Sequence, residues 1–237
     1  MPHGTLYLIP VTLGDDHFAG VLPVQVVDVA RRLDTFVVEN EKSARRFLGS
    51  IKTIKPVREL VLLTLNEHTA EKDIPALLEP LLSGKDVGVM SEAGCPGIAD
   101  PGAKLVALAH RKGIQVKPLV GPSSILLALI ASGLDGQRFS FLGYLPAEKS
   151  ARILKLKEIE NRSAKAGETQ IFIETPYRNQ HLLEDLVVHC HDQTRLCVAS
   201  NLTLENELIQ SRSVAEWRKS TLPNLHKQPT VFLLLAS

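Results

Sequence analysis

The residue types best suited to chemistry lie in one glycine- and proline-rich loop, Ser91-Glu-Ala-Gly-Cys-Pro-Gly-Ile-Ala-Asp100. This loop follows Val87-Gly-Val-Met90, an apolar run that is too short for a buried helix and is typical of a central strand. Gly94, Pro96 and Gly97 favour a turn that leaves backbone N–H groups exposed at the strand's carboxyl end, where open parallel sheets bind ligands. A simple connection between a strand and a helix would have the same composition. The pattern therefore predicts the turn but leaves open whether the turn binds a ligand.

Length, charge and cysteine content narrow the class of protein. A chain of 237 residues with 44% hydrophobic content is long enough for one large or two ordinary domains with a substantial core. Lys plus Arg (27) and Asp plus Glu (26) nearly cancel, so the overall charge indicates neither nucleic-acid nor membrane binding, although a local basic patch stays compatible. The three cysteines, Cys95, Cys190 and Cys197, show no C-x-x-C spacing, so we expect no disulfide framework and no metal site.

The chain shows no sign of export or of a membrane span. The N-terminal segment Gly4-Thr-Leu-Tyr-Leu-Ile-Pro10 has no basic region and no cleavage site, and no stretch approaches about 18 uninterrupted apolar residues. We therefore expect a cytoplasmic protein that does not bind membranes.

Strand and helix patterns alternate along the first half of the chain. The expected strands are 5–9, 35–38, 59–65, 87–90 and 115–120, and the expected helices are 22–33, 42–48, 69–82, 101–112 and 125–132. Thr69 and Asp100 fit N-cap positions, and Pro101 fits the first residue of the fourth helix. The helix at 125–132 is apolar on all sides, which predicts that it is buried between layers.

The pattern of expected strands and helices changes after Gly133. Strands are expected at 139–146, within 167–176, and at 196–200, 207–211 and 230–235, with helices at 147–165, 177–190 and 214–219. We therefore place an N-terminal α/β domain at 1–135 and a C-terminal α/β domain at 136–237. The G-x-G-x-x-G dinucleotide fingerprint is missing, because the first loop reads Pro10-Val-Thr-Leu-Gly14. A nucleotide-like ligand held by the loops after strands one, four and five is compatible with this pattern.

Several motifs together resemble a known family. They are Gly4-Thr-Leu-Tyr7 with Pro10, Ser91–Gly102, Gly121-Pro-Ser-Ser124, Ala131-Ser-Gly-Leu134 and Phe141-Leu-Gly-Tyr-Leu-Pro146. In this order and at this spacing they resemble the tetrapyrrole methylase superfamily of S-adenosylmethionine-dependent methyltransferases, closest to its ribosomal RNA small-subunit 2′-O-ribose methyltransferase branch. The likeness extends from residue 4 to about residue 205. It implies an α/β fold of two domains with a cofactor cleft between them, usually in a homodimer.

The resemblance also implies which residues contact the cofactor, S-adenosyl-L-methionine. They are Pro10, Gly94, Cys95, Pro96, Ser123, Ser124 and Glu174. A donor built from an amino acid, a ribose and a base needs backbone donors and acceptors, hydroxyls and a carboxylate, all of which these positions offer. The plain alternatives are that Gly94 and Pro96 only form a turn, that Ser123 only caps a helix, and that Glu174 is a solvated strand end.

Some motifs depart from the RNA-modifying branch. Its A-E-D-T-R stretch is Val38-Glu-Asn-Glu-Lys42 here, and its T-P-I-G-N-L-x-D loop is replaced at 11–14. Its H-E-H-N stretch is partly kept as Asn66-Glu-His-Thr69, and Y-E-x-P-x-R survives as Ile173-Glu-Thr-Pro-Tyr-Arg178. The chain is expected to be a short form without the extra C-terminal domain of longer members. Cofactor chemistry is expected to be retained, whereas the acceptor is open.

The favoured activity is 2′-O-methylation of ribosomal RNA, by in-line attack of a ribose oxygen on the methyl group without a metal. Glu39, Glu67 and His68 are the candidate proton acceptors, although His68 also fits a polar helix start. The alternatives are a methyltransferase acting on a tetrapyrrole-like or other metabolite and a non-catalytic cofactor-binding protein. Binding of ribosomal RNA or the small subunit, rather than DNA, predicts a basic groove. Its candidate residues are Arg45, Arg46, Lys52, Lys55, Arg152 and Lys155. Arg178 fits either a solvated position or a contact to phosphate or carboxylate.

Overall fold

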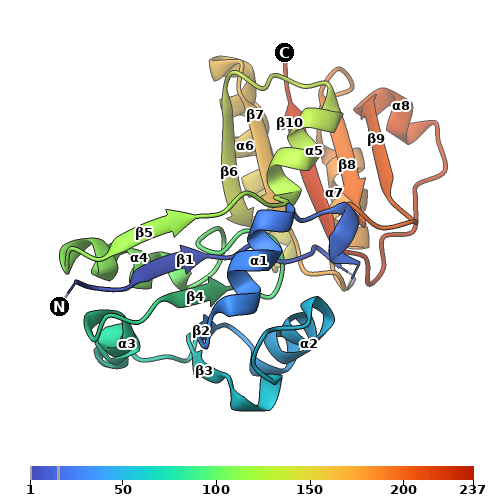
Figure 1. The fold of residues 1–237 in the computed structure, drawn as a ribbon. Helices are drawn as coiled ribbons and strands as arrows, with labels where there is room; N and C mark the ends of the chain where they lie inside the picture. The colour runs from blue at the N-terminus through green and yellow to red at the C-terminus, as the bar shows by residue number, and fades with distance from the viewer. Residues whose placement is uncertain (1, 15–16) are drawn as a thin grey trace. The chain divides into compact units, whose positions relative to one another are not determined.

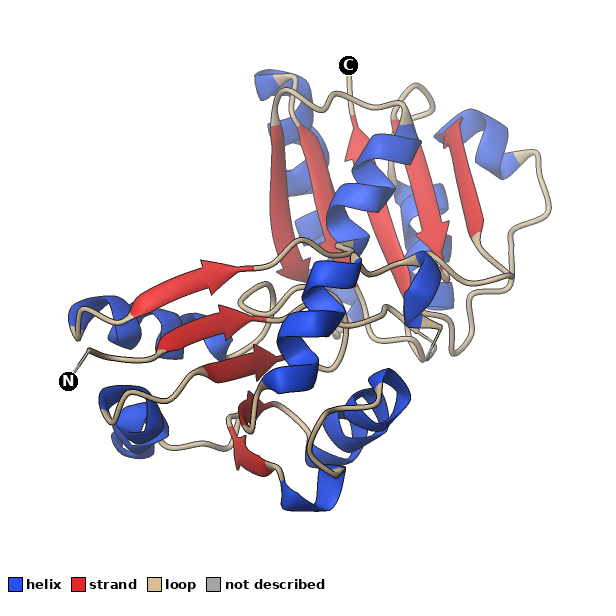
Figure 2. Ribbon diagram, in the orientation of Figure 1, coloured by secondary structure: helices blue, strands red, loops and turns tan. Residues whose placement is uncertain are grey.

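The computed structural model describes residues 2–14 and 17–237. Contacts divide the chain into two compact units, Met1–Ser123 and Ser124–Ser237. Each unit contains one five-stranded sheet (Figures 1 and 2). Within the described residues, no helix combines the length and the apolar character needed to cross a lipid bilayer.

Unit 1 is built on a parallel sheet with the strand order β3-β2-β4-β1-β5. The strands are β1 (Thr5–Leu8), β2 (Thr35–Val38), β3 (Val61–Thr64), β4 (Val87–Met90) and β5 (Gln115–Pro118). The helices are α1 (Val24–Arg32), α2 (Glu41–Ile51), α3 (Glu79–Leu82) and α4 (Gly102–Arg111), with 3-10 turns η1 (Phe18–Gly20), η2 (Val57–Glu59) and η3 (Glu71–Leu78). The predicted central position of the strand at 87–90 is confirmed.

Two apolar clusters explain why β4 occupies the centre of this sheet. One cluster joins β2 to α1 and α2, and the other joins β4 to α4 and the η3–α3 segment. All four residues of β4 are buried, as expected for a parallel strand covered on both faces. A side chain at Gly88 would meet Ile9 Cδ1 at 2.6 Å and Phe36 Cδ1 at 2.7 Å, so glycine lets the neighbouring strands fill this space.

Three local predictions for unit 1 need correction. The helix expected at 69–82 is a 3-10 segment followed by the short α3, because Pro75 has no N–H to donate within an α-helix. Thr69 is not its N-cap, since the Thr69 hydroxyl accepts a hydrogen bond from the Asn66 N–H at 3.0 Å instead. The fourth helix begins at Gly102, one residue later than predicted, and Asp100 still accepts a hydrogen bond from the Gly102 N–H at 2.7 Å.

Unit 2 is built on a mixed sheet with the order β6-β7-β10-β8-β9. The strands are β6 (Phe139–Tyr144), β7 (Thr169–Ile173), β8 (Arg195–Ser200), β9 (Leu208–Ser213) and β10 (Thr230–Leu235). The helices are α5 (Ser124–Ser132), α6 (Lys149–Ala166), α7 (Asn179–His189) and α8 (Val214–Arg218). β6 and β7 are parallel, and β10 runs antiparallel to both β7 and β8. The core of this unit gathers around Trp217, Phe172 and Phe232.

The apolar helix α5 differs from its prediction. Ala128 and Leu129 are buried, and the helix packs against β10, β8 and β9, but Leu126 is 48% and Ile130 79% exposed. The prediction that this helix is buried all round is therefore wrong, because the sheet of unit 2 covers only one of its sides. These contacts group α5 with unit 2, whereas the sequence analysis places the domain boundary after residue 135.

Candidate functional site

Three loops of unit 1 meet at Gly94. The Val11 N–H donates to the Gly94 carbonyl at 2.9 Å and the Gly94 N–H donates to the Thr12 carbonyl at 3.4 Å, which joins the loops after β1 and β4. Gly94 has a positive φ of 69°, and a Cβ there would lie 3.1 Å from Leu13 Cδ2 and 3.3 Å from the Pro122 carbonyl oxygen. The loop after β5 thus closes on the same glycine, at the carboxyl end of the parallel strands.

The predicted cofactor residues of unit 1 lie around this junction. The Cys95 thiol donates to the Pro122 carbonyl at 3.3 Å, and burial raises the pKa of this thiol. Pro10 is in close contact with Gly121, where an added Cβ would come within 2.2 Å of the proline ring. Pro96 and Ser123 are buried beside these contacts in the chain. The structure therefore brings together the loops that carry Pro10, Gly94, Cys95, Pro96 and Ser123.

The Asp100 side chain stabilises the conformation of the loop that follows β4, called here the β4 loop. Its carboxylate accepts hydrogen bonds from the Gly97 N–H at 2.8 Å and the Gly102 N–H at 2.7 Å. Burial raises the pKa of Asp100, while these two hydrogen bonds lower it. Ala99, directly before it, has a positive φ of 60°, a conformation that is uncommon for a residue with a side chain. The loop is therefore held in a defined, strained conformation, as is frequent at ligand sites.

Glu39 is the candidate proton acceptor that contacts this loop. It follows β2, and its Oε2 accepts a hydrogen bond from the Glu92 N–H at 3.2 Å. The pKa of Glu39 is raised, mainly by burial and further by the nearby carboxylates of Glu92, Asp100 and Glu67, against the lowering effect of the Glu92 hydrogen bond. A carboxylate with a raised pKa is a better proton acceptor at neutral pH.

Glu67 and His68 have a different environment. Both side chains are about 85% exposed, and they lie 3.5 Å from each other in a turn that is held by Asn66. Glu67 acts on Glu39 through its charge, and no hydrogen bond among the described residues joins His68 to Glu39. Of the three predicted acid–base residues, the structure therefore connects only Glu39 directly to the β4 loop.

In unit 2, Glu174 is buried instead of forming a solvated strand end. Its Oε1 accepts hydrogen bonds from the Thr175 N–H and from Arg178 Nη2, each at 2.6 Å. Its Oε2 is fully buried and has no hydrogen-bond partner within residues 2–14 and 17–237. The hydrogen bond to Glu174 raises the pKa of Arg178. Of the two environments that the sequence left open for Arg178, the structure therefore shows a contact to a carboxylate. An unpaired buried carboxylate oxygen is costly unless a ligand satisfies it.

Sequence reasoning missed the polar side chains that lie near the same end of unit 2. Asn179, fully buried at the start of α7, donates from Nδ2 to the Gln228 carbonyl at 2.6 Å, and its Oδ1 lacks a partner among the described atoms. Gln228 Oε1 in turn accepts a hydrogen bond from Asn201 Nδ2 at 3.0 Å. Polar residues placed directly at the ends of apolar strands are the signal that would have pointed to this cluster.

The expected basic groove needs correction at Arg152. This residue is 5% exposed, and its guanidinium binds the buried Asp185 through Nη2 at 2.6 Å and Nε at 2.8 Å. Arg152 is therefore a structural cation of unit 2. Lys55 pairs with Asp34 at 2.5 Å, and Arg45 pairs with Glu41 at 3.2 Å, although both pairs are exposed.

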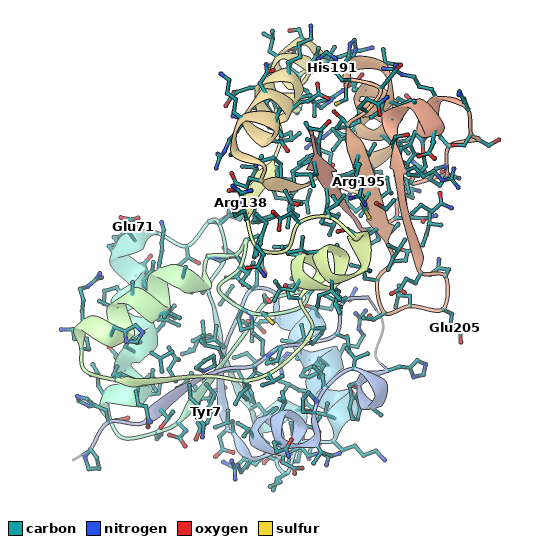
Figure 3. All side chains as sticks on the ribbon, turned by 90° about the horizontal axis from the view of Figure 1, so that it is seen from above. Tyr7, Glu71, Arg138, His191, Arg195 and Glu205 are labelled. Carbon is teal, nitrogen blue, oxygen red and sulfur yellow. The ribbon has the colours of Figure 1, made fainter. Side chains whose placement is uncertain are left out.

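A cavity of about 680 Å³ lies at the opposite, amino-terminal edge of the unit 1 sheet. Tyr7, which Figure 3 labels, lines it together with residues that precede or begin the strands, among them Asp34 and Asp86. None of the predicted cofactor-binding or proton-accepting residues lines this cavity, whereas Lys55, a candidate residue of the basic groove, does. Within the described part of the chain, no group of three or more acidic, histidine or cysteine side chains could hold a metal ion.

The two sheets define an α/β protein with a candidate ligand site in the loops of unit 1, and comparison with known proteins specifies its family. Residues 5–217 match the family described as Tetrapyrrole (Corrin/Porphyrin) Methylases. The chain therefore belongs to the tetrapyrrole methylase family of methyltransferases.

Three curated relatives are each called ribosomal RNA small subunit methyltransferase I. The protein from Vibrio cholerae is 34% identical over 91% of this chain, the one from Micromonospora olivasterospora 32% over 86%, and the one from Thermotoga maritima 31% over 81%. The matched regions cover 72%, 61% and 82% of these relatives, so the chain spans only part of their length.

Two solved structures share the fold. The methyltransferase CobJ superposes with a TM-score of 0.64 at 18% identity, over 100% of this chain and 95% of that chain. The cobalamin biosynthetic enzyme cobalt precorrin-4 methyltransferase, CbiF, superposes with a TM-score of 0.62 at 16% identity, over 98% of this chain and 94% of that chain. The predicted α/β fold is confirmed, and the structure shows that it contains two sheets.

Proposed function

We propose that the protein uses S-adenosylmethionine to methylate a ribose 2′-hydroxyl in small-subunit ribosomal RNA, in the cytoplasm. The observation that carries the proposal is the meeting of the loops after β1, β4 and β5 at Gly94. The relatives named as small-subunit ribosomal RNA methyltransferases support RNA as the acceptor.

The residues present fit the cofactor. The β4 loop offers backbone groups in a fixed turn, and the buried Glu174 Oε2 lacks a donor among the described residues. We propose that Pro10, Gly94, Cys95, Pro96 and Ser123 hold the cofactor in unit 1. Ser124 and Glu174 remain predicted contacts from unit 2. When bound, S-adenosylmethionine supplies an electrophilic methyl group on a sulfonium sulfur.

Glu39 is proposed to accept the proton of the attacking ribose hydroxyl. Its raised pKa and its position at the β4 loop support this role. Positioned proton transfer typically contributes about 10²- to 10⁴-fold to a rate. Holding the reacting atoms in line, about 3–3.5 Å apart, supplies most of the remaining advantage without a covalent intermediate. Glu67 and His68 remain weaker predictions because both are exposed.

The test is transfer of labelled methyl groups from S-adenosylmethionine to undermethylated small ribosomal subunits and, separately, to a metabolite extract. Methylation at a ribose is recognised by the resistance of the adjacent phosphodiester to alkaline hydrolysis. We expect label in the RNA, and a Glu39→Gln variant that is about 10²-fold slower or worse with unchanged cofactor affinity. Label in a metabolite alone would refute RNA as the acceptor. A Glu39→Gln variant as fast as the parent would refute the role of Glu39.

A homodimer is proposed as well. Leu126 and Ile130 are one helical turn apart on α5 and are exposed, so a second copy that covers them would remove apolar surface from water. A stable dimer of this kind buries about 2,000 Å² or more in total. Light scattering should give the mass of a dimer for the parent and of a monomer for Ile130→Glu. Leu154→Glu, at another exposed apolar position on α6, is the matched control and should stay dimeric.

A further inference from the structure

We propose that one edge of unit 2 binds a single-stranded segment of the RNA substrate by stacking a base on Tyr177. The binding surface, called here the aromatic edge, consists of Tyr144, Tyr177, Arg178, His226 and Lys227. This inference rests on the proposed RNA-directed function and adds the place where unit 2 contacts the acceptor strand.

The sheet topology brings these residues to one edge. β6 is parallel to β7, and β10 is antiparallel to β7, so the ends of β6 and β7 and the start of β10 coincide. Tyr144 ends β6, Tyr177 and Arg178 follow β7, and the segment before β10 carries His226 and Lys227. The Lys227 N–H donates to the Pro176 carbonyl at 2.9 Å, which fastens the two loops together.

The Tyr177 ring is presented to solvent and held in place. The residue is 66% exposed. The His226 ring packs against it edge-on at 6.1 Å between centroids, and Lys227 Nζ lies 5.8 Å from the ring centroid. An exposed aromatic ring with a cation beside it is the arrangement that proteins use to stack an unpaired base and hold its phosphate.

The charge beside the ring is also suited to a phosphate backbone. Arg178 is held by Glu174, whose side chain is fully buried, whereas the Arg178 side chain is 40% exposed. The exposed side chain of this ion pair is therefore the arginine and not the carboxylate, although Arg178 Nε itself is buried. Tyr144, at the end of β6, is also exposed and adds a second ring to the same edge.

Carboxylates at this edge limit the electrostatic part of binding. Glu148 accepts hydrogen bonds from the Ser150 and Ala151 N–H groups, and Glu207 accepts one from the Thr203 N–H. Glu205 projects at the tip of the loop between β8 and β9 (Figure 3). Since these charges oppose a phosphate backbone, we expect base stacking to carry much of the affinity and only about two phosphates to be contacted.

The position of the ring fits the proposed chemistry. Tyr177 lies three residues after Glu174, a predicted cofactor contact, in the same loop. A base stacked on Tyr177 would therefore belong to a nucleotide that flanks the one receiving the methyl group. Stacking is tolerant of base identity, so this contact would position the strand and leave its sequence to be recognised elsewhere.

The experiment measures binding of a fluorescein-labelled, single-stranded RNA of twelve mixed nucleotides to the full chain by fluorescence anisotropy. Tyr177→Ala should weaken binding at least about fivefold, and Tyr177→Phe, which keeps the ring, should bind within about twofold of the parent. Lys227→Gln should weaken binding and reduce the slope of log Kobs against log salt by about 0.7. Lys219→Gln, an exposed lysine that follows α8 beyond the far end of β9, is the matched control and should change neither value.

Methyl transfer to small ribosomal subunits is measured in parallel, and thermal unfolding shows that each variant is folded. If the parent binds RNA and methylates it while Tyr177→Ala and Lys227→Gln bind as tightly as the parent, the aromatic edge is refuted and the proposed function stands. If the parent neither binds RNA nor methylates it, both proposals fall. If Tyr177→Ala does not fold, the Lys227→Gln salt slope and the Lys219→Gln control still decide the proposal.

Discussion

Replacing Gly94 by alanine would place a methyl group at the junction of three loops in unit 1. The new Cβ would lie 3.1 Å from Leu13 Cδ2 and 3.3 Å from the Pro122 carbonyl oxygen, which is tighter than ordinary contact. The positive φ of 69° adds a conformational cost of about 1–2 kcal/mol for a residue with a side chain. The loops must therefore separate by a few tenths of an ångström, and we expect affinity for S-adenosylmethionine to fall at least tenfold, about 1.4 kcal/mol.

The variant Gly97→Ala separates the effect of the positive φ from the effect of the close contacts at Gly94. Gly97 also has a positive φ, of 88°, but a Cβ there would meet nothing within 4 Å, and its N–H is already bonded to Asp100. It should therefore carry the same conformational cost of about 1–2 kcal/mol without disturbing the junction. Urea unfolding should show this loss of stability for Gly97→Ala and an equal or larger loss for Gly94→Ala, whose side chain also meets close contacts.

Isothermal titration calorimetry with S-adenosylmethionine then distinguishes them. We expect Gly97→Ala to bind within about threefold of the parent and Gly94→Ala to bind at least tenfold more weakly. Equal affinities for the parent and Gly94→Ala would show that the cofactor does not depend on the junction of these loops. Equal losses of affinity for S-adenosylmethionine in both glycine variants would show that loop strain alone, and not the contact at Gly94, controls binding.

Three further predictions concern stability, each measured by urea unfolding. Arg152→Met should cost about 3–5 kcal/mol because it leaves the buried Asp185 with only the exposed Lys149, at 4.0 Å, as a counter-charge, and Arg152→Met with Asp185→Leu should recover most of that loss; a single variant as stable as the parent would contradict this. Asn40→Ala should cost about 1 kcal/mol by removing the N-cap of α2, and Asn40→Asp should restore it. Hydrogen bonds from Ser150 and Ala151 lower the pKa of Glu148 to about 2, so its contribution is complete above about pH 4.5 and is lost as the pH falls towards 2. Parent and Glu148→Gln should then differ at pH 6 and converge near pH 2.

The alternation of strands and helices, the central place of the strand at 87–90 and the family were readable from the sequence. Those features depend on neighbouring residues, whose apolar spacing and turn formers act within a few positions of each other. The convergence of the loops after β1, β4 and β5 was also predictable, because parallel strands place their carboxyl ends at one edge. The sequence predicted Thr69 as a helix N-cap. In the structure, the Thr69 hydroxyl instead accepts a hydrogen bond from the N–H of the neighbouring Asn66.

Only the tertiary structure decided the roles that depend on distant partners. Arg152 and Asp185 are thirty-three residues apart, and Tyr177 and His226 forty-nine, so no local pattern distinguishes a buried ion pair or a packed ring from a solvated side chain. The same holds for α5, whose uniform apolar character predicts burial but not which sheet covers it or which side stays exposed. The sequence by itself determined the elements and their family. Long-range packing determined which of their charged and aromatic residues are buried in structural contacts and which stay exposed, because burial is a property of contacts that the chain makes only once it is folded.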